Sequence, residues 1–376
     1  MIRSLRCILV LSVANLTTLV RAEPAATKPT PWRTLAPIPN PIGFGGMFAG
    51  VCEDGLFAGG GSQFVGGPSW QGGEKFYSDK VYFLPALDGS WRELPDRLPE
   101  PRANAACAPH GNAVIAAGGV NATGPLRSVV KIGIHKGDLS VESLPPLPHP
   151  LVYASAAVVR DVFYVVGGVP DAASKETSQE CWALPLTVPP GSTTSAGWIR
   201  LPDLPGRAGI VMATGADDHG FYVFGGAAFL PPDGETTPTI PLDNAYRYDP
   251  ASSVWIELAD VPAPRVGAAT PVPRLPDGSF FLAGGYGFIF VGEAKNHPGF
   301  DPETFLYSPS KNLWTNGPPF PRHRTIDPEK ATSPGPEPVI SSPAVLWHNQ
   351  VVIISGEVRP SIRTSAVVAI PVSAVR

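Results

Sequence analysis

The run Phe163-Tyr164-Val165-Val166-Gly167-Gly168 is a short apolar stretch that ends in two glycines. The pattern predicts a buried β-strand that ends at a crowded point, where a side chain would clash with a neighbouring backbone. Four other runs have the same form, and a sixth keeps the strand but alters the diglycine. These runs lie at residues 56–60, 114–119, 221–226, 280–285 and 351–356.

The spacing of the diglycines points to a repeat architecture. Their second glycines, at positions 60, 119, 168, 226 and 285, are 59, 49, 58 and 59 residues apart. A strand ending in Gly-Gly that recurs at about this period is typical of a kelch-type β-propeller. In four repeats a Trp-centred strand follows the diglycine by 29 to 31 residues. We therefore predict an all-β fold, a six-bladed kelch-type propeller with four antiparallel strands per blade.

The two ends of the chain predict how the ring closes. The last repeat, from residue 341 onward, supplies three strands but no fourth. Trp32-Arg33-Thr34-Leu35 has the form of a fourth strand with no blade before it. We predict that it pairs with residues 366–370, because closing the ring removes exposed sheet edges.

The first residues predict export. Arg3 and Arg6 precede the apolar run at residues 7–14, and Val20-Arg21-Ala22 offers a small-residue cleavage site. We expect a signal peptide at residues 1–22 and a single propeller domain at residues 23–376, periplasmic or secreted. The apolar run is too short to favour an uncleaved anchor, so no stable membrane span is expected after cleavage.

Composition narrows the function classes. The chain has 376 residues and a formal charge of −4, without a basic stripe, so nucleic acid is not an expected partner. Its seven histidines show no metal-ligand spacing, and we predict neither a metal nor a cofactor. The three cysteines after residue 22 cannot all pair, so we expect no disulfide framework. The sequence predicts no oligomeric state.

Strand order predicts which face carries the site. In an antiparallel blade the start of the first strand and the end of the second share one rim, and the long loops follow the second strands. Arginines at blade entries and in loops of this rim suggest an anionic ligand, because a guanidinium binds carboxylates bidentately. The entry arginines can equally be structural. The entry arginines are Arg102, Arg207 and Arg265, and the loop arginines are Arg322, Arg324, Arg359 and Arg363.

The sixth run differs from the others in its chemistry. It continues Ser355-Gly356-Glu357-Val358-Arg359-Pro360-Ser361-Ile362-Arg363-Thr364, so a carboxylate follows the strand end where other blades have Val, Ala or Tyr. A carboxylate beside a fixed cation at a pocket mouth can perform general acid–base catalysis. A surface salt bridge is the alternative interpretation.

This stretch resembles the Gly-Glu-x-x-Pro-x-x-Arg-Thr motif of bacterial N-acetylneuraminate mutarotases, also called N-acetylneuraminate epimerases. Residues 44–50, Phe44-Gly45-Gly46-Met47-Phe48-Ala49-Gly50, followed by the run from residue 56, also look like a segment of that family. The order of the two segments resembles the cyclically permuted branch.

The resemblance implies an exported propeller that interconverts the anomers of sialic acid. It makes Glu357 the acid–base group, and Arg363 the group that binds the substrate carboxylate or steadies developing charge. Phe44, Met47 and the entry arginines Arg102, Arg207 and Arg265 are the expected substrate-binding residues. The loop at residues 286–303 is short for the family and the insert at residues 322–340 is its own, which leaves the sugar open.

Three other functions compete with this interpretation. A non-catalytic module that binds carbohydrate or protein is the main one, because fold does not determine function. A copper oxidase of the galactose oxidase type would need a Tyr–Cys pair and clustered histidines. A sialidase would carry Ser-x-Asp-x-Gly-x-x-x-Trp repeats, which the sequence lacks.

Overall fold

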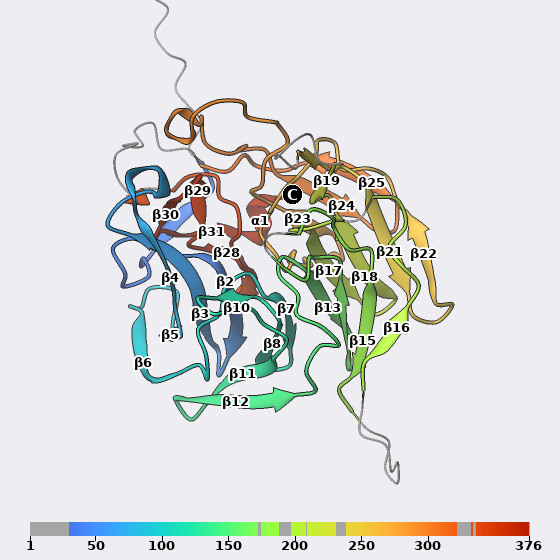
Figure 1. The fold of residues 1–376 in the computed structure, drawn as a ribbon, viewed down its shortest axis with the longest axis horizontal. Coiled ribbons are helices and arrows are strands. Elements are labelled where there is room, and N and C mark those ends of the chain that lie inside the picture. The colour runs from blue at the N-terminus through green and yellow to red at the C-terminus, as the bar shows by residue number, and fades with distance from the viewer. Residues whose placement is uncertain are drawn as a thin grey trace, which may run out of the picture. The chain divides into compact units, whose positions relative to one another are not determined.

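Six β-sheets form the blades of a propeller and follow one another along the chain in the computed structural model (Figure 1). The structure describes residues 30–171, 174–187, 197–207, 209–230, 238–321, 332–333 and 336–375. The predicted signal peptide at residues 1–22 and the loop arginines Arg322 and Arg324 lie outside these ranges. In the described part of the chain, no helix has the length and apolar character needed to cross a bilayer.

The first three blades are complete meanders, in which the strands pair in chain order. Blade 1 contains β2 (Gly45–Cys52), β3 (Gly55–Val65), β5 (Lys80–Leu84) and β6 (Arg92–Arg97), with β4 (Glu74–Tyr77) paired to the end of β3 and η1 (Ser69–Gln71) between them. Blade 2 contains β7 (Ala106–His110), β8 (Ala113–Ala117), β11 (Val129–His135) and β12 (Asp138–Leu144), plus the small hairpin β9 (Val120–Asn121) and β10 (Gly124–Pro125). Blade 3 contains β13 (Ser155–Val159), β14 (Val162–Val166), β15 (Cys181–Pro185) and β16 (Ile199–Leu201).

The last three blades show two departures from this plan. Blade 4 contains β17 (Ala213–Asp217), β18 (Gly220–Phe224), β21 (Ala245–Asp249) and β22 (Val254–Glu257), plus the hairpin β19 (Ala227–Phe229) and β20 (Thr239–Pro241). Blade 5 contains β23 (Phe280–Leu282), β24 (Phe305–Ser308) and β25 (Leu313–Asn316), with η2 (Ala294–Asn296) in its rim loop. Blade 6 contains β27 (Ala344–Trp347), β28 (Gln350–Ile354) and β31 (Val367–Pro371), followed by α1 (Val372–Val375).

The N-terminal strand completes blade 6, as predicted. β1 (Arg33–Leu35) pairs antiparallel with β31, with Arg33 opposite Ala369 and Leu35 opposite Val367. Blade 6 therefore takes its outer strand from the start of the chain. The prediction of a six-bladed propeller closed by this strand is confirmed.

Blade 5 has no regular inner strand among the described residues, contrary to the prediction of four strands per blade. Its inner segment is joined to β23 by an isolated bridge between Arg274 and Phe280. Pro271 and Pro273 interrupt this segment, and proline has no N–H to give to a ladder. The segment still lines the channel, but it cannot complete the sheet.

The diglycines connect each blade to the next. The N–H of the second glycine donates to a carbonyl at the entry of the following blade, as Gly119 does to Leu151 at 2.7 Å. The first glycine has a positive φ, and a Cβ on Gly118 would lie 2.4 Å from that same carbonyl oxygen. This close approach explains the glycine requirement. The equivalent bonds join Gly61 to Arg102, Gly168 to Gly209, Gly226 to Arg265, Gly285 to Val339 and Gly356 to Phe44.

Two details of these junctions differ from the sequence pattern. In blade 1 the pair is Gly60-Gly61, not Gly59-Gly60, because Gly60 and Gly61 have the positive φ angles and contact Arg102. In blade 6 the first position is Ser355, at a φ of 56°. Its hydroxyl accepts from the Phe44 N–H at 2.8 Å and lies 2.9 Å from the Phe44 carbonyl oxygen.

A second ring of hydrogen bonds surrounds the channel. One residue per blade, at the start of the inner segment, has a left-handed φ between 47° and 71° and donates its N–H to the equivalent residue of the preceding blade, at 2.7–3.3 Å. The six bonds form a closed cycle, which holds the blade entries at fixed distances from one another. The six residues are Gly46, Asn104, Tyr153, Val211, Gly267 and Ser341.

Apolar clusters between neighbouring blades form the core. Four Trp residues also connect blades, because each indole N–H donates at 2.8–3.0 Å to a backbone carbonyl that follows the outer strand of the preceding blade. The pairs are Trp91 to Ala36, Trp198 to Pro145, Trp255 to Pro202 and Trp314 to Ala259.

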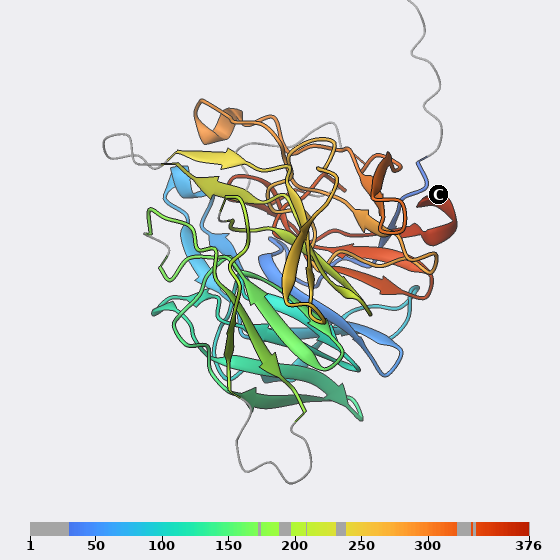
Figure 2. The same cartoon turned by 90° about the vertical axis from the view of Figure 1, so that its right-hand side faces the viewer.

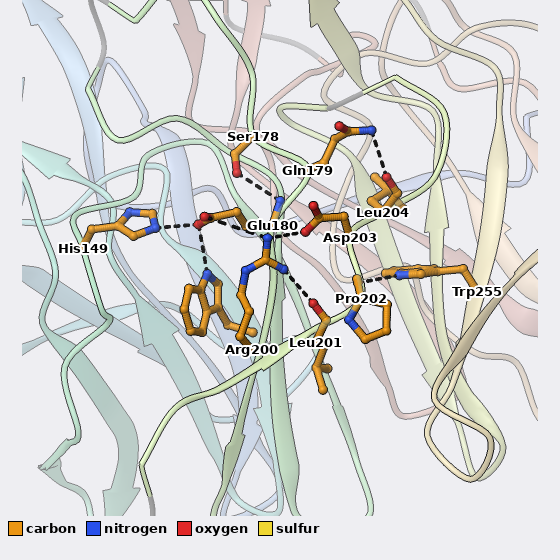
Figure 3. A network of polar contacts seen from close by, with 11 residues as sticks. His149, Ser178, Gln179, Glu180, Arg200, Leu201, Pro202, Asp203, Leu204 and Trp255 are labelled. Atoms are coloured by element: carbon orange, nitrogen blue, oxygen red, sulfur yellow. Dashed lines mark hydrogen bonds and ion pairs between the residues drawn. The ribbon is translucent and has the colours of Figure 1, made fainter.

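A polar network reinforces blade 3 at its outer edge (Figure 3). Glu180 accepts from Trp182 at 3.1 Å and bonds the His149 ring at 2.6 Å. Arg200 forms an ion pair with Asp203 and lies 3.9 Å from Glu180. The network joins the segment that enters blade 3 to its third and fourth strands.

Candidate functional site

The sixth-blade motif folds into a small hairpin on the rim. β29 (Glu357–Arg359) pairs antiparallel with β30 (Ile362–Thr364), and β26 (Thr332–Ser333) pairs parallel with β30. Glu357 lies directly opposite Arg363, and the Arg363 guanidinium forms a hydrogen-bonded ion pair with the Glu357 carboxylate. The two predicted catalytic residues are therefore in contact. Their side chains are 18% and 5% exposed, so the carboxylate is accessible while its cation is held.

Arg363 is fixed by blade 1, which lies beside the motif hairpin (Figure 1). Its Nε donates to the Ser62 carbonyl at 3.3 Å, and its guanidinium lies 5.3 Å from the Phe64 ring centroid. A Cβ on Gly45 would lie 2.9 Å from the Arg363 Nε, so this glycine makes room for the side chain. In the described part of the chain, no group bonds the Arg363 Nη2.

Glu357 occupies a position that is repeated in every blade. Its backbone forms a two-way bridge with Ile340, with N···O distances of 2.9 and 3.0 Å. The same bridge is made by Val120, Val169 and Ala227 in blades 2 to 4 and by Tyr286 in blade 5. Those valine and alanine side chains belong to an apolar cluster at the channel rim. The motif therefore places a carboxylate where blades 2 to 5 have apolar or aromatic side chains and blade 1 has Ser62.

A cavity of about 390 Å³ opens beside Glu357, within the size range of small-molecule sites. Rim segments of blades 4, 5 and 6 enclose it, and Figure 2 shows the hairpin β19–β20 and the loop that carries η2 at the same edge of the propeller. Aromatic side chains from blade 5 form one part of its wall. The aromatic and histidine side chains that line it are Tyr286, Phe288, Phe290, His297 and Phe300.

Cationic and phenolic groups surround the Glu357–Arg363 pair. The Lys75 ammonium lies 5.3 Å from the Tyr77 ring centroid, and burial together with the Arg363 charge lowers the pKa of Lys75. Burial raises the pKa values of Tyr153 and Tyr286, and the Glu357 charge raises them further. These phenols stay protonated at neutral pH and can donate hydrogen bonds near the carboxylate.

The predicted entry arginines lie elsewhere on the rim. Arg102 is 2% exposed, and its Nη1 donates to the carbonyls of Gly118 and Ser128 at 2.5 and 3.0 Å. Arg265 is 1% exposed, 3.3 Å from Asp301, with its guanidinium 4.7 Å from the Phe305 ring centroid.

Arg102 and Arg265 occupy equivalent positions at the blade junctions. Their guanidinium groups contact backbone carbonyls, carboxylates and an aromatic ring of the propeller. Arg207 is exposed, two residues before the junction residue Gly209. The structure does not gather these three side chains at Glu357, and their predicted contact with substrate stays a prediction.

Phe44 and Met47 belong to the apolar cluster between blades 6 and 1, next to the motif hairpin. The Phe44 side chain packs between blades 6 and 1, while its backbone bonds both Ser355 and Gly356. Met47 is 7% exposed and lines the central channel. The two segments that carry the resemblance are therefore in contact, although they are about 310 residues apart. Direct contact of either side chain with substrate stays a prediction.

The predicted site residues did not include three groups that lie near Glu357 or its cavity. Lys75 comes from β4, Tyr153 from the entry of blade 3 and His297 from the rim loop of blade 5, and no local pattern distinguishes Lys75 and His297 from surface residues. For Tyr153 a signal existed, because it directly follows the bridge residue at its blade entry. Within the described residues, no three His, Cys, Asp or Glu side chains are grouped so as to hold a metal ion.

Comparison with known proteins adds a second line of evidence. No protein-family model matches the chain. Curated proteins named N-acetylneuraminate epimerase are similar to it: 27% identity over 199 residues in Yersinia pestis (strain Pestoides F), covering 46% of each chain. The relative in Yersinia enterocolitica serotype O:8 is 25% identical over 253 residues, covering 61% of this chain and 57% of its own. The relative in Brucella melitensis biotype 1 is 25% identical, covering 60% and 58%. The chain matches about half the length of these relatives.

Proposed function

We propose that this protein is an exported mutarotase that interconverts the α and β anomers of an acidic sugar, N-acetylneuraminic acid. The observation that carries the proposal is the Glu357–Arg363 pair at the edge of an aromatic cavity, in a position where the sister blades have no carboxylate. The names of the curated relatives support the choice of reaction.

The chemistry needs one proton removed and one delivered. Glu357, as the carboxylate, takes the proton of the anomeric hydroxyl, and the bond between the anomeric carbon and the ring oxygen breaks. The ring oxygen receives a proton from the Glu357 acid, directly or through water, which leaves an open-chain ketone and the original carboxylate. Rotation about the bond next to the ketone carbon presents the other face of the carbonyl to the ring-forming hydroxyl. The reverse steps then close the ring and give the other anomer. General acid–base catalysis of this kind contributes about 10²- to 10⁴-fold.

The neighbouring cations suit an anionic substrate. The Arg363 guanidinium lies against Glu357, and Lys75 adds a second positive charge that interacts with both. Two cations and one carboxylate give the site a net positive charge in a chain of net negative charge. A substrate carboxylate held by the guanidinium fork would place the adjacent anomeric carbon near Glu357.

Exchange NMR of the anomeric signals of N-acetylneuraminic acid tests the proposal. We expect the full mature chain to raise the rate of α–β exchange above the buffer value at micromolar protein. If the sugar binds, seen by ligand-observed NMR, but exchanges at the buffer rate, the non-catalytic binding module replaces the enzyme. If the sugar neither binds nor exchanges faster, both the substrate and the activity are wrong.

A further inference from the structure

His297 is a buried side chain in the wall of the Glu357 cavity that the proposed chemistry leaves unused. It is 5% exposed and comes from the rim loop of blade 5, just after η2. The rings of Phe288, Phe290 and Phe300 lie 5.5, 4.8 and 5.2 Å from its own. A histidine enclosed by three phenylalanines needs an explanation, because buried polar atoms normally have partners.

The hydrogen bond at Nδ1 determines the tautomer. Nδ1 accepts from the Gly299 N–H at 3.1 Å, so in the neutral ring the proton lies on Nε2. Burial, with the nearby charge of Arg359 as a second cause, lowers the pKa of His297 to about 4. The ring is therefore neutral at physiological pH, with Nε2–H as its hydrogen-bond donor.

The donor is left for a ligand. Among the residues that the structure describes, no group bonds Nε2, and the ring lines the same cavity as Glu357. Phe288 and Phe290, which also line the cavity, place apolar surface next to the donor. Of the charges on described residues, the one that acts on the ring is that of Arg359, which itself interacts with the Glu337 carboxylate. A neutral donor beside apolar surface matches a neutral acceptor oxygen with an alkyl group next to it, which is the chemistry of an acyl substituent. A carboxylate would instead be drawn to Arg363 and Lys75.

We infer that His297 is a specificity residue, whose Nε2–H binds the carbonyl oxygen of an acyl substituent on the substrate while the phenylalanines contact its alkyl part. The inference rests on the proposed function and deepens it. The cavity then has two ends, an acid–base end at Glu357 and an acyl-binding end at His297. The acyl end supplies binding and orientation, and it takes no part in proton transfer.

Two sugars and three variants test the inference. The sugars are N-acetylneuraminic acid and the corresponding nonulosonic acid with a hydroxyl in place of the acetamido group. His297→Phe removes the donor and keeps an aromatic ring, whereas His297→Gln keeps an amide N–H donor. His135→Phe is the matched control, because His135 is exposed at the end of β11.

We expect His297→Phe to raise the KM for the acylated sugar about tenfold, the upper range for one hydrogen bond, with kcat nearly unchanged. The KM for the hydroxyl sugar should change less than twofold. His297→Gln should recover part of the loss, and His135→Phe should match wild type.

Other results would overturn the role of His297 or the proposed function itself. Equal losses of both sugars would make His297 a purely structural residue, and an unchanged KM in His297→Phe would also overturn the inference. If wild type accelerates exchange but shows the same KM for both sugars, the inference fails while the proposed function stands. If wild type accelerates neither, the proposed function fails, and binding of the two sugars by ligand-observed NMR still tests His297.

Discussion

Blades 1 to 5 and blade 6 form the same backbone junction to the next blade with different side chains. In blade 2, Gly118 leaves no room for a Cβ and Val120 adds an apolar side chain to the channel rim. In blade 6, Ser355 replaces the first glycine and bonds Phe44, and Glu357 takes the place of the valine. The backbone bridge is kept while the side chains change from apolar to polar. The repeat thus supplies a rigid frame, and one blade of it carries the chemistry.

Replacing a regular glycine tests the steric side of this comparison most strongly. Gly118→Ala would force alanine to a φ of 63° with its Cβ 2.4 Å from the Leu151 oxygen. We expect a loss of about 3 kcal/mol of stability, from the left-handed backbone and the overpacking together. Urea denaturation followed by tryptophan fluorescence measures it. A loss below about 0.5 kcal/mol, the scale of an ordinary surface substitution, would refute the account of the diglycine.

Removing the hydroxyl in blade 6 tests the polar side. Ser355→Ala leaves the buried Phe44 N–H without the oxygen that accepts from it at 2.8 Å. We expect a loss of about 2 kcal/mol, the range for an unsatisfied buried donor. The same denaturation experiment applies. A variant as stable as wild type would mean that the serine is tolerated and not required.

Arg363→Lys tests whether the Arg363 guanidinium binds the substrate carboxylate. Lysine keeps the charge but loses the bidentate geometry and the bond from Nε to Ser62. We expect the KM for the acidic sugar to rise about tenfold, equivalent to one strong hydrogen bond, with a smaller change in kcat. A fall in kcat at constant KM would instead assign Arg363 to the transition state alone.

Glu180 offers a structural carboxylate on the same rim. Burial raises its pKa, but the hydrogen bonds from His149 and Trp182 and the charges of His149 and Arg200 outweigh burial and lower the pKa below the usual value. Such a group stabilises the fold above its unfolded pKa, and this contribution is lost as pH falls through the folded pKa. Glu180→Gln should therefore cost below about 1 kcal/mol at pH 7, since the pair is partly exposed.

The stability gap between wild type and Glu180→Gln should narrow as the pH falls below about 4, the range in which an ordinary glutamate titrates. Chemical denaturation at pH 7, 5 and 3.5 measures this gap. A gap that stays constant with pH would show that the carboxylate charge contributes nothing.

The sequence predicted the fold well because its information is local and repeated. A glycine pair after each apolar run reports a backbone contact that recurs at every blade, and Trp32 to Leu35 has the pattern of a missing strand. The exceptions arose where the local sequence pattern did not determine the backbone packing. Three glycines in a row, Gly59 to Gly61, hid the true register of blade 1, and Pro271 with Pro273 prevented a strand that the period required.

The site was only partly predictable from the sequence. Glu357 and Arg363 are six residues apart on one hairpin, so their contact follows from local structure. Lys75 reaches the same region on β4 of blade 1 and His297 on the rim loop of blade 5, and nothing in their neighbouring sequence indicates it. For the entry arginines the sequence left a ligand-binding and a structural role open. The structure shows Arg102 bonding the carbonyls of Gly118 and Ser128, and its contact with substrate stays a prediction.

The most direct test of the central claim compares two carboxylates. Exchange NMR of N-acetylneuraminic acid with wild type, Glu357→Gln and Glu180→Gln measures catalysis under identical conditions. We expect Glu357→Gln to lower catalysed exchange by at least about tenfold, at the conservative end of acid–base contributions, because the amide keeps its size but cannot take a proton. Glu180→Gln should retain the wild-type rate. Catalysed exchange that survives in Glu357→Gln would contradict the claim that the carboxylate of blade 6 performs the chemistry.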